Sequence, residues 1–378
     1  MGMEKIRRLA NIELLRIVAM LLIVCYHFSS HGLVLVDYDF DDSNRFFNWL
    51  MRGIGYIGVN VYILISAYFL CKGSFKFKKL IQLILEVWFY SLAIYMLMLV
   101  THQVPFSPKG FFTSFLPTLF SQYWFVTCYV VLYILSPFLN RVIRHLYESG
   151  AANSRNIILS NPLFKFTALL LVLFSVIPQF VPFSEWLHFG GTCGIVWMTV
   201  VYFIGASLRY FVDIEKLKEK KRTVWLLAAC FWVLPLLTKV VIANISFKLT
   251  GNVVGSSLFY MNNSVIIVAS SIFTFLAFCT IEVNRGGKII NFIASSTLAV
   301  YLIHDNNYIR PILWEKVNGL TDTDWLMLQT FAITFAIFLI CILIDFGRRG
   351  LFKLVASIIG DNPFIARVSA RIDKWFTE

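Results

Sequence analysis

The sequence contains repeated apolar stretches that are long enough to cross a lipid bilayer as helices. A helix needs about 20 mostly apolar residues to span the hydrocarbon core of a membrane. Ten stretches meet or approach this length, at residues 12–30, 54–71, 80–101, 122–141, 166–182, 193–212, 223–242, 258–281, 289–305 and 327–346. We therefore predict an all-α fold, a polytopic transmembrane bundle of about ten spans. Residues 111–120 are too short to span and contain Pro117, so we expect a re-entrant or interfacial segment there.

The scarcity of charge supports the same fold class. Only 14% of the residues are charged and 58% are hydrophobic, with a mean hydropathy of +0.74, whereas a soluble domain has about 25% charged residues. The segments between the apolar stretches are short, so we predict one integral-membrane domain over residues 1–378 and no extramembrane domain. Such a chain must act within the bilayer, as a transporter, a channel or an intramembrane enzyme.

The distribution of lysine and arginine predicts the orientation of the bundle. If the N-terminus is cytoplasmic, 25 of these residues fall on the inner side and 7 on the outer side, while Arg16 lies within a span. Positive residues are concentrated in cytoplasmic loops, so we predict that both termini are cytoplasmic in a multi-pass protein of the cell membrane. The first stretch has a basic start but no small-residue cleavage pattern, and we expect it to be retained as the first helix.

The net charge of +12 follows this topology. Positive loops face anionic membrane lipids, and we predict no nucleic-acid partner. The seven cysteines are dispersed over the apolar stretches without a C-x-x-C pair. They are typical of buried thiols, and we predict no metal site and no disulfide framework.

Three ionisable residues lie in the first apolar stretch: Glu13, Arg16 and His27. Such residues are costly inside a membrane, so each is a candidate functional residue. Glu13 and Arg16 are three residues apart and can pair on one helix face. Arg16 and His27, eleven residues apart, share a face and are separated by about 16 Å along the helix axis. The alternative is that Arg16 extends to the inner headgroups and His27 lies at the outer interface.

Two further clusters of polar residues lie near other apolar stretches. Lys76 and Lys79 precede the third stretch, which carries Glu86. These lysines are either ordinary positive-inside anchors or a cationic rim for a phosphate-bearing ligand. The ninth stretch carries Tyr301 and His304, three residues apart on one face, and the predicted topology places His304 at about the depth of His27.

Four ordered segments resemble the membrane-bound acyltransferase-3 family. They are N-I-E-L-L-R at 11–16 through Y-H-F at 26–28, G-V-N-V-Y-I-L-I-S at 58–66, Y-W-F at 123–125 with Pro137, and S-T-L-A-V-Y-L-I-H at 296–304. The arginine, ten residues and histidine of the first segment are the family's hallmark. Some residues depart from its pattern. Lys76 and Lys79 occupy the positions where the family often has paired arginines. Glu13 and Asn60 replace aspartates, and Ala67 replaces a glycine.

The resemblance implies an O-acyltransferase. Family members move an acyl group, usually acetyl, from cytoplasmic acyl-CoA to a hydroxyl of an extracytoplasmic acceptor. Acceptors include capsule, exopolysaccharide and other envelope glycans, so we expect acetyl-CoA as the donor and an envelope glycan or lipid-linked sugar as the acceptor. A secondary transporter or flippase of an envelope glycolipid and a non-catalytic envelope partner are the alternatives.

A mechanism compatible with these residues places the phosphates of acyl-CoA at Arg16, Lys76 and Lys79. The long arm of the donor then extends along the bundle to His27, which acts as general base or as an acyl relay. Glu13 or Glu86 orients the cationic groups. We expect the acceptor side to be lined by Trp124, Tyr301 and His304.

Overall fold

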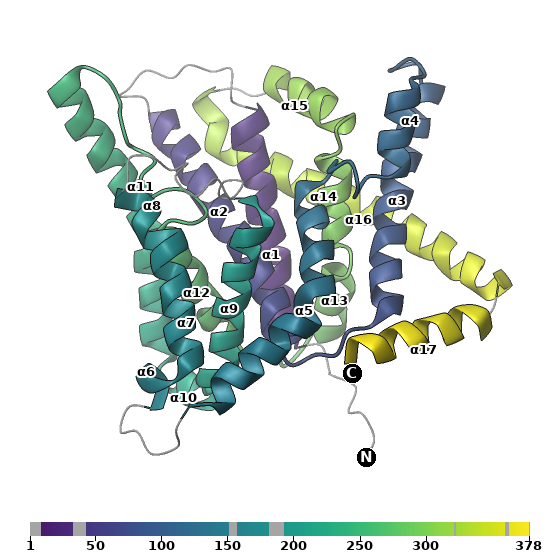
Figure 1. Ribbon diagram of the computed structural model, residues 1–378. Helices are drawn as coiled ribbons and strands as arrows, with labels where there is room; N and C mark the ends of the chain where they lie inside the picture. The colour runs from purple at the N-terminus through teal and green to yellow at the C-terminus, as the bar shows by residue number, and fades with distance from the viewer. Residues whose placement is uncertain are drawn as a thin grey trace. The chain divides into compact units, whose positions relative to one another are not determined.

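The computed structural model describes residues 9–32, 43–150, 157–180, 193–320, 323–359 and 363–377. Every regular element in these ranges is a helix, which confirms the predicted all-α class (Figure 1). The α-helices are α1 Ala10–His27, α2 Ser43–Leu70, α3 Phe77–Val100, α4 Pro108–Phe115, α5 Trp124–Glu148, α6 Ile157–Ser160, α7 Pro162–Leu171, α8 Ile177–Phe180, α9 Ile195–Phe211, α10 Ile214–Glu219, α11 Lys221–Thr250, α12 Val265–Cys279, α13 Gly287–Ala294, α14 Thr297–His304, α15 Ile309–Leu320, α16 Leu326–Ile359 and α17 Pro363–Thr377.

Eight helical segments are long and apolar enough to cross a membrane, judged by length and composition. They are Ala10–Gly32, Asn44–Leu70, Phe77–Val100, Trp124–Glu148, Pro162–Phe180, Lys221–Thr250, Gly287–His304 and Leu326–Val355. Two shorter apolar helices, α9 and α12, fall on the other two predicted stretches. Each of the ten stretches thus contains a helix, while the number of spans and the orientation of the termini remain predictions.

The chain divides into two compact units, which we describe separately. The first consists of Met1–Ile65 and Val212–Leu298, and the second of Ser66–Phe211 and Ala299–Glu378. The first unit therefore contains α1, most of α2 and α10 to α13. The second contains α3 to α9 and the helices from α15 onward.

In the first unit, α1 packs against α12 and α13, while α11 runs beside α12 (Figure 1). The Asn11 side-chain amide donates to the Phe278 carbonyl oxygen at 3.1 Å, which attaches the start of α1 to the end of α12. Gly58 lets α2 approach α1 closely, because a Cβ at this position would lie 2.8 Å from the Ala19 carbonyl oxygen. The sequence of α2 is thus fitted to contact the helix that carries Arg16 and His27.

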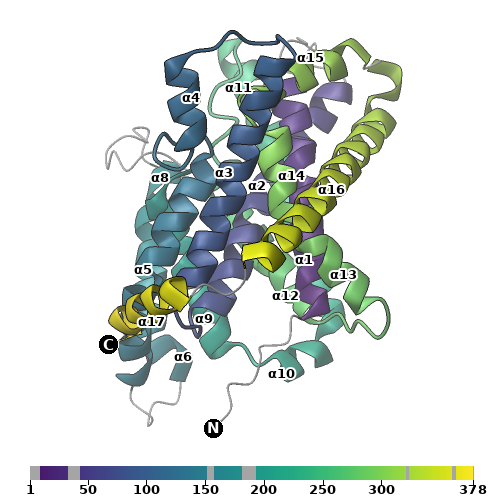
Figure 2. The same ribbon diagram turned by 90° about the vertical axis from the view of Figure 1, so that its right-hand side faces the viewer.

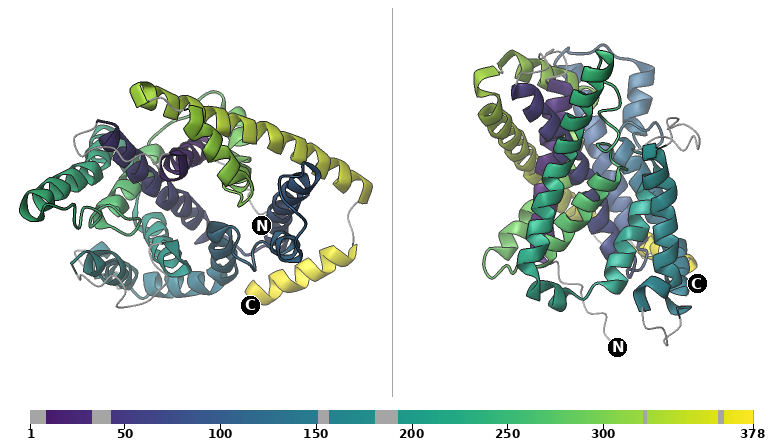
Figure 3. Two further views of the ribbon diagram at one scale, coloured as in Figure 1. Left: turned by 90° about the horizontal axis from the view of Figure 1, so that it is seen from above. Right: turned by 90° about the vertical axis from the view of Figure 1, so that its left-hand side faces the viewer.

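In the second unit, α5 packs against α9, which also contacts α7 (Figure 3). The buried Asn140 side chain links three segments: its amide donates to the Leu70 carbonyl oxygen at 2.8 Å, and its oxygen accepts from the Tyr202 hydroxyl at 2.7 Å. Helix α17 lies against α3, where the Phe77 amide donates to the Asp373 carboxylate at 2.6 Å (Figure 2).

The predicted span over 289–305 coincides with the apolar segment Gly287–His304, which the structure divides into two helices. Helix α13 ends at Ala294 and α14 begins at Thr297. The Ser295 hydroxyl donates to the Phe292 carbonyl oxygen at 2.6 Å. Serine hydroxyls that bond to the backbone in this way compete with the helical ladder, which accounts for the interruption.

The C-terminal region also differs from the prediction. We expected the tenth span to end near residue 346, but α16 continues to Ile359. The Arg348 side chain is only 9% exposed and pairs with Glu86 and Asp345. A buried ion-pair network, which a hydropathy pattern does not reveal, therefore holds the second half of α16. Over residues 111–120 the structure contains the end of α4 followed by turns.

Candidate active site

The first half of α1 carries a partly buried ion pair. A guanidinium nitrogen of Arg16 lies 3.8 Å from Oε1 of Glu13, and Glu13 is 4% exposed. The other carboxylate oxygen, Oε2, is buried and accepts no hydrogen bond from the described residues. The Arg16 guanidinium also lies 5.9 Å from the centre of the Tyr62 ring, whose hydroxyl is 3.0 Å from the Thr297 hydroxyl. Glu13 and Tyr62 thus hold Arg16 from two sides.

His27 ends α1 and is 8% exposed. The chain continues from it into a π-helical turn, Phe28–Gly32. Single π turns within helices are frequent at functional sites. Arg16 and His27 therefore lie on one helix, as predicted, with the histidine at its C-terminal end.

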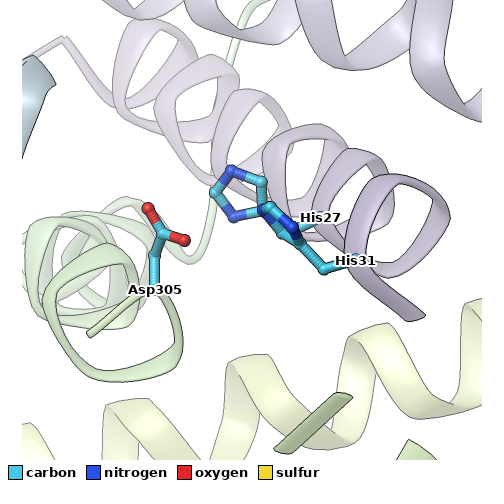
Figure 4. A group of neighbouring side chains, drawn as sticks. All are labelled: His27, His31 and Asp305. Atoms are coloured by element: carbon cyan, nitrogen blue, oxygen red, sulfur yellow. The ribbon is translucent and has the colours of Figure 1, made fainter. Parts of the chain in front are cut away.

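His31 is a candidate that the sequence analysis missed. Its ring centre lies 5.3 Å from that of His27 (Figure 4). The four-residue spacing between the two histidines was the available signal, because residues four apart are neighbours on a helix. The exposed His31 beside the buried His27 places a second imidazole next to the candidate base.

The second unit contains the predicted lysines. Lys76 precedes α3, where its backbone amide donates to the Tyr133 hydroxyl at 3.1 Å and its carbonyl oxygen accepts from that hydroxyl at 3.2 Å. Lys79 lies in the first turn of α3 and is exposed. Glu86, further along α3, pairs with Arg348 at 3.2 Å. Lys76 is half-buried, so of the two lysines only Lys79 is fully exposed at the start of α3.

The predicted acceptor-side residues also lie in the second unit. Tyr301 and His304 are buried on α14, with ring centres 6.5 Å apart, and Trp124 begins α5. Nδ1 of His304 lies 2.5 Å from the Val300 carbonyl oxygen. A carbonyl oxygen only accepts, so this contact requires the proton on Nδ1.

A buried hydrogen-bond network that the sequence analysis did not foresee follows α14. The Asn306 side-chain amide donates to the Tyr123 hydroxyl at 2.6 Å, and this hydroxyl donates to the Leu302 carbonyl oxygen at 3.0 Å. Asp305, next to Asn306, pairs with Arg310 at 3.4 Å. The end of α14 is thus a polar region fixed by its own contacts.

The structure therefore brings together Glu13, Arg16 and His27 in the first unit. The other predicted residues belong to the second unit, where Lys76 and Lys79 lie at the start of α3. Trp124, Tyr301 and His304 lie on α5 and α14. Their roles remain predictions from the sequence.

Comparison with known proteins decides the family. The model of the family described as "Acyltransferase domain", acyltransferase-3, matches residues 9–346. The chain belongs to the acyltransferase-3 family. The match includes every predicted site residue of this membrane acyltransferase and ends before Arg348 and α17. Searches of the curated proteins and of the solved structures gave no match.

Asn60 of the acyltransferase makes a buried hydrogen bond. The family segment that it resembles has an aspartate at this position. Asn60 is 2% exposed, and its side-chain amide donates to the Asn262 carbonyl oxygen at 2.7 Å. An aspartate carboxylate at this position would face a carbonyl that also only accepts. We expect Asn60→Asp to destabilise the protein by about 1–3 kcal/mol, measured as thermal unfolding in detergent. A melting temperature equal to that of the wild type would contradict this assignment, and Asn284→Asp, at an exposed position, is the control.

Proposed function

We propose that this membrane acyltransferase moves an acetyl group from acetyl-CoA to a hydroxyl of an extracytoplasmic envelope glycan. The observation that carries the proposal is α1, which holds the Glu13–Arg16 ion pair in its first half and the buried His27 at its end. The two positions are separated by about 16 Å along the helix, which is comparable to the reach of the pantetheine arm. One donor molecule can therefore contact both.

Arg16 is the proposed ligand for the donor phosphates. A guanidinium group binds phosphate through two parallel hydrogen bonds. Glu13, at 3.8 Å, orients the guanidinium and retains a buried oxygen that lacks a donor among the described residues. The contribution of Lys76 and Lys79 to donor binding is proposed from the sequence alone.

His27 is the proposed general base. Its neutral imidazole takes the proton of the acceptor hydroxyl as the hydroxyl oxygen attacks the thioester carbonyl carbon. A carbon–oxygen bond forms, the carbon–sulfur bond breaks, and the coenzyme leaves as a thiolate that receives the proton from His27. The products are the acetyl ester and free coenzyme A, and the histidine returns to its neutral form.

A relay through an acyl-enzyme is the alternative route for the same reaction, with His27 as the nucleophile. A buried thiol is a weaker candidate for this role. Cys71, for example, is 2% exposed, and buried structural cysteines are inert as nucleophiles.

Arg16→Ala tests the donor site in the purified full-length protein. We expect KM for acetyl-CoA to rise about 10- to 100-fold, because a charge-assisted contact is worth about 1.5–3 kcal/mol, with Arg16→Lys in between. Transfer of labelled acetyl groups and release of coenzyme A are both measured. Arg222→Ala, an exposed arginine of α11, is the matched control. An unchanged KM in Arg16→Ala would remove Arg16 from the donor site.

A secondary transporter or flippase of an envelope glycolipid is the second candidate function. The interruption between α13 and α14 favours it, because discontinuous helices line the binding sites of many transporters. Purified protein that releases coenzyme A from acetyl-CoA supports the transferase. Protein that never consumes acetyl-CoA, yet moves a glycolipid across a vesicle membrane, supports the transporter.

A further inference from the structure

Two cations lie together in the first unit and belong to none of the predicted sites. Lys239, in the second half of α11, is only 8% exposed. Arg52, in α2, is three residues from Trp49, over whose ring the Lys239 ammonium lies, and its charge acts on that of Lys239. The two like charges repel each other. A buried lysine in an apolar helix is costly, so the position needs a reason.

No carboxylate pairs with either cation in the described part of the chain. Lys239 Nζ donates to the Ser257 hydroxyl at 3.3 Å and lies over two aromatic rings, 4.9 Å from the centre of Trp49 and 4.5 Å from that of Tyr260. Aromatic faces attract cations without neutralising them. Nε of Arg52 is buried and makes no hydrogen bond to the described residues. The two cations therefore carry positive charge that no described carboxylate compensates, and the rings of Trp49 and Tyr260 lie beside Lys239.

This cation pair lies next to the turn that follows His27. A guanidinium nitrogen of Arg52 donates to the Ser29 carbonyl oxygen at 3.4 Å, and the Ser29 hydroxyl also bonds to Asn48. Arg52 thus contacts a residue that lies two positions after the candidate base His27.

A series of aromatic rings connects the same two places. The ring of Tyr26, which precedes His27, lies 5.2 Å from that of Tyr56, and Tyr56 meets Tyr260 edge to face at 5.9 Å. Tyr260 is the residue over which the Lys239 ammonium lies. Gly53 makes room for this tyrosine, because a Cβ there would lie 3.0 Å from its ring.

We infer that Lys239 and Arg52 bind an anionic group of the acceptor, so that the acyltransferase acts on an acidic glycan. This inference rests on the proposed function, because it names the acceptor class of the same site. A carboxylate or a phosphate between the two cations removes their repulsion and supplies the missing acceptor oxygens. Binding the acid at this place holds the rest of the acceptor beside the His27 turn. A carboxylate would come from an acidic sugar, and a phosphate from a lipid-linked sugar.

Binding of matched small probes tests the inference without any turnover. Full-length protein in neutral phosphatidylcholine nanodiscs is titrated with methyl β-glucuronide, methyl β-glucoside and methyl β-glucoside 6-phosphate. Tryptophan fluorescence is the readout, since Trp49 contacts Lys239. We expect at least one acidic probe to bind about 10- to 100-fold more tightly than the neutral probe. The tighter of the two acidic probes identifies the source of the anion.

Substitution of the lysine gives the decisive comparison. Lys239→Met keeps the length of the side chain without its charge, and we expect it to remove the preference for acidic probes while neutral binding is unchanged. Lys239→Arg should retain the preference. Arg52→Met is the second variant if Lys239→Met proves unstable in a melting test. Equal binding of acidic and neutral probes by the wild type, or a preference that survives both substitutions to methionine, would overturn the inference.

The chain's own acids require a further control. Four aspartates, at 37, 39, 41 and 42, lie outside the described residues. All four aspartates are changed to asparagine in one variant. If the preference for acidic probes appears only in that variant, the protein's own aspartates neutralise Lys239 and Arg52, and the inference is overturned. Release of coenzyme A is measured in the same preparations. If the wild type releases no coenzyme A, the proposed function is contradicted. The binding result tests the acceptor site independently.

Discussion

His27→Ala is expected to reduce acetyl transfer about 10²- to 10⁴-fold, the usual contribution of a positioned general base. The physical reason is that the acceptor hydroxyl must lose its proton as it attacks, and alanine cannot take it. Because Arg16 is intact on the same helix, KM for acetyl-CoA should change little. The measurement is transfer of labelled acetyl by purified protein, together with O-acetyl groups on surface polysaccharide in cells that carry the variant at normal membrane levels.

Two other histidines serve as comparisons for this result. His145→Ala changes an exposed residue in the last turn of α5 and should leave transfer unchanged. His31→Ala tests the imidazole beside His27, and we expect a smaller loss than for His27→Ala. Transfer that persists in His27→Ala at the wild-type rate would rule out its role as base, and His304 would become the next candidate.

The same variant separates direct transfer from the relay. In the relay, wild-type protein mixed with labelled acetyl-CoA and no acceptor retains a covalent label that His27→Ala lacks. In direct transfer, neither protein retains one. Both routes require the histidine, so the loss of activity alone does not distinguish them.

Much of α1 could be predicted from the sequence, because its features are local. The spacing of Glu13, Arg16 and His27 along one helix determines which of them share a face, and the structure contains that helix with the ion pair formed. The all-α class followed from the apolar stretches for the same reason. Hydrophobic length depends on the composition of a segment and not on its partners.

The features that escaped prediction depend on partners distant in sequence. Arg348 lies beyond the last predicted span, and only the fold shows that Glu86, on another helix, is its partner. Lys239 looked like one of a few outer-side cations, and its contacts with Trp49 and Tyr260 come from separate segments. The interruption at Ser295 was missed because a mean hydropathy averages over the whole stretch, so it carries no sign of a local hydroxyl contact.

Arg348→Ala is expected to destabilise the protein by about 3–5 kcal/mol, the cost of removing one partner of a buried ion pair. Arg348 lies 3.2 Å from Glu86 on α3 and donates to Asp345 at 2.7 Å, and Asp345 is fully buried. The Tyr90 hydroxyl also donates to Asp345, at 2.7 Å. Without the arginine, two carboxylates remain in an apolar region with one hydroxyl donor. Thermal unfolding in detergent, followed by intrinsic fluorescence, measures the loss.

Two variants serve as controls for Arg348→Ala. Lys353→Ala removes an exposed cation from the same helix and should melt as the wild type does. The combination of Arg348→Met, Glu86→Gln and Asp345→Asn removes all three charges at once. It should recover most of the stability, since the cost of Arg348→Ala comes from the unpaired carboxylates rather than from the lost arginine. If Arg348→Ala melts as Lys353→Ala does, the network does not hold α16 to α3. If the triple variant is no more stable than Arg348→Ala, the loss comes from the contact of the guanidinium group with the Tyr90 and Phe352 rings.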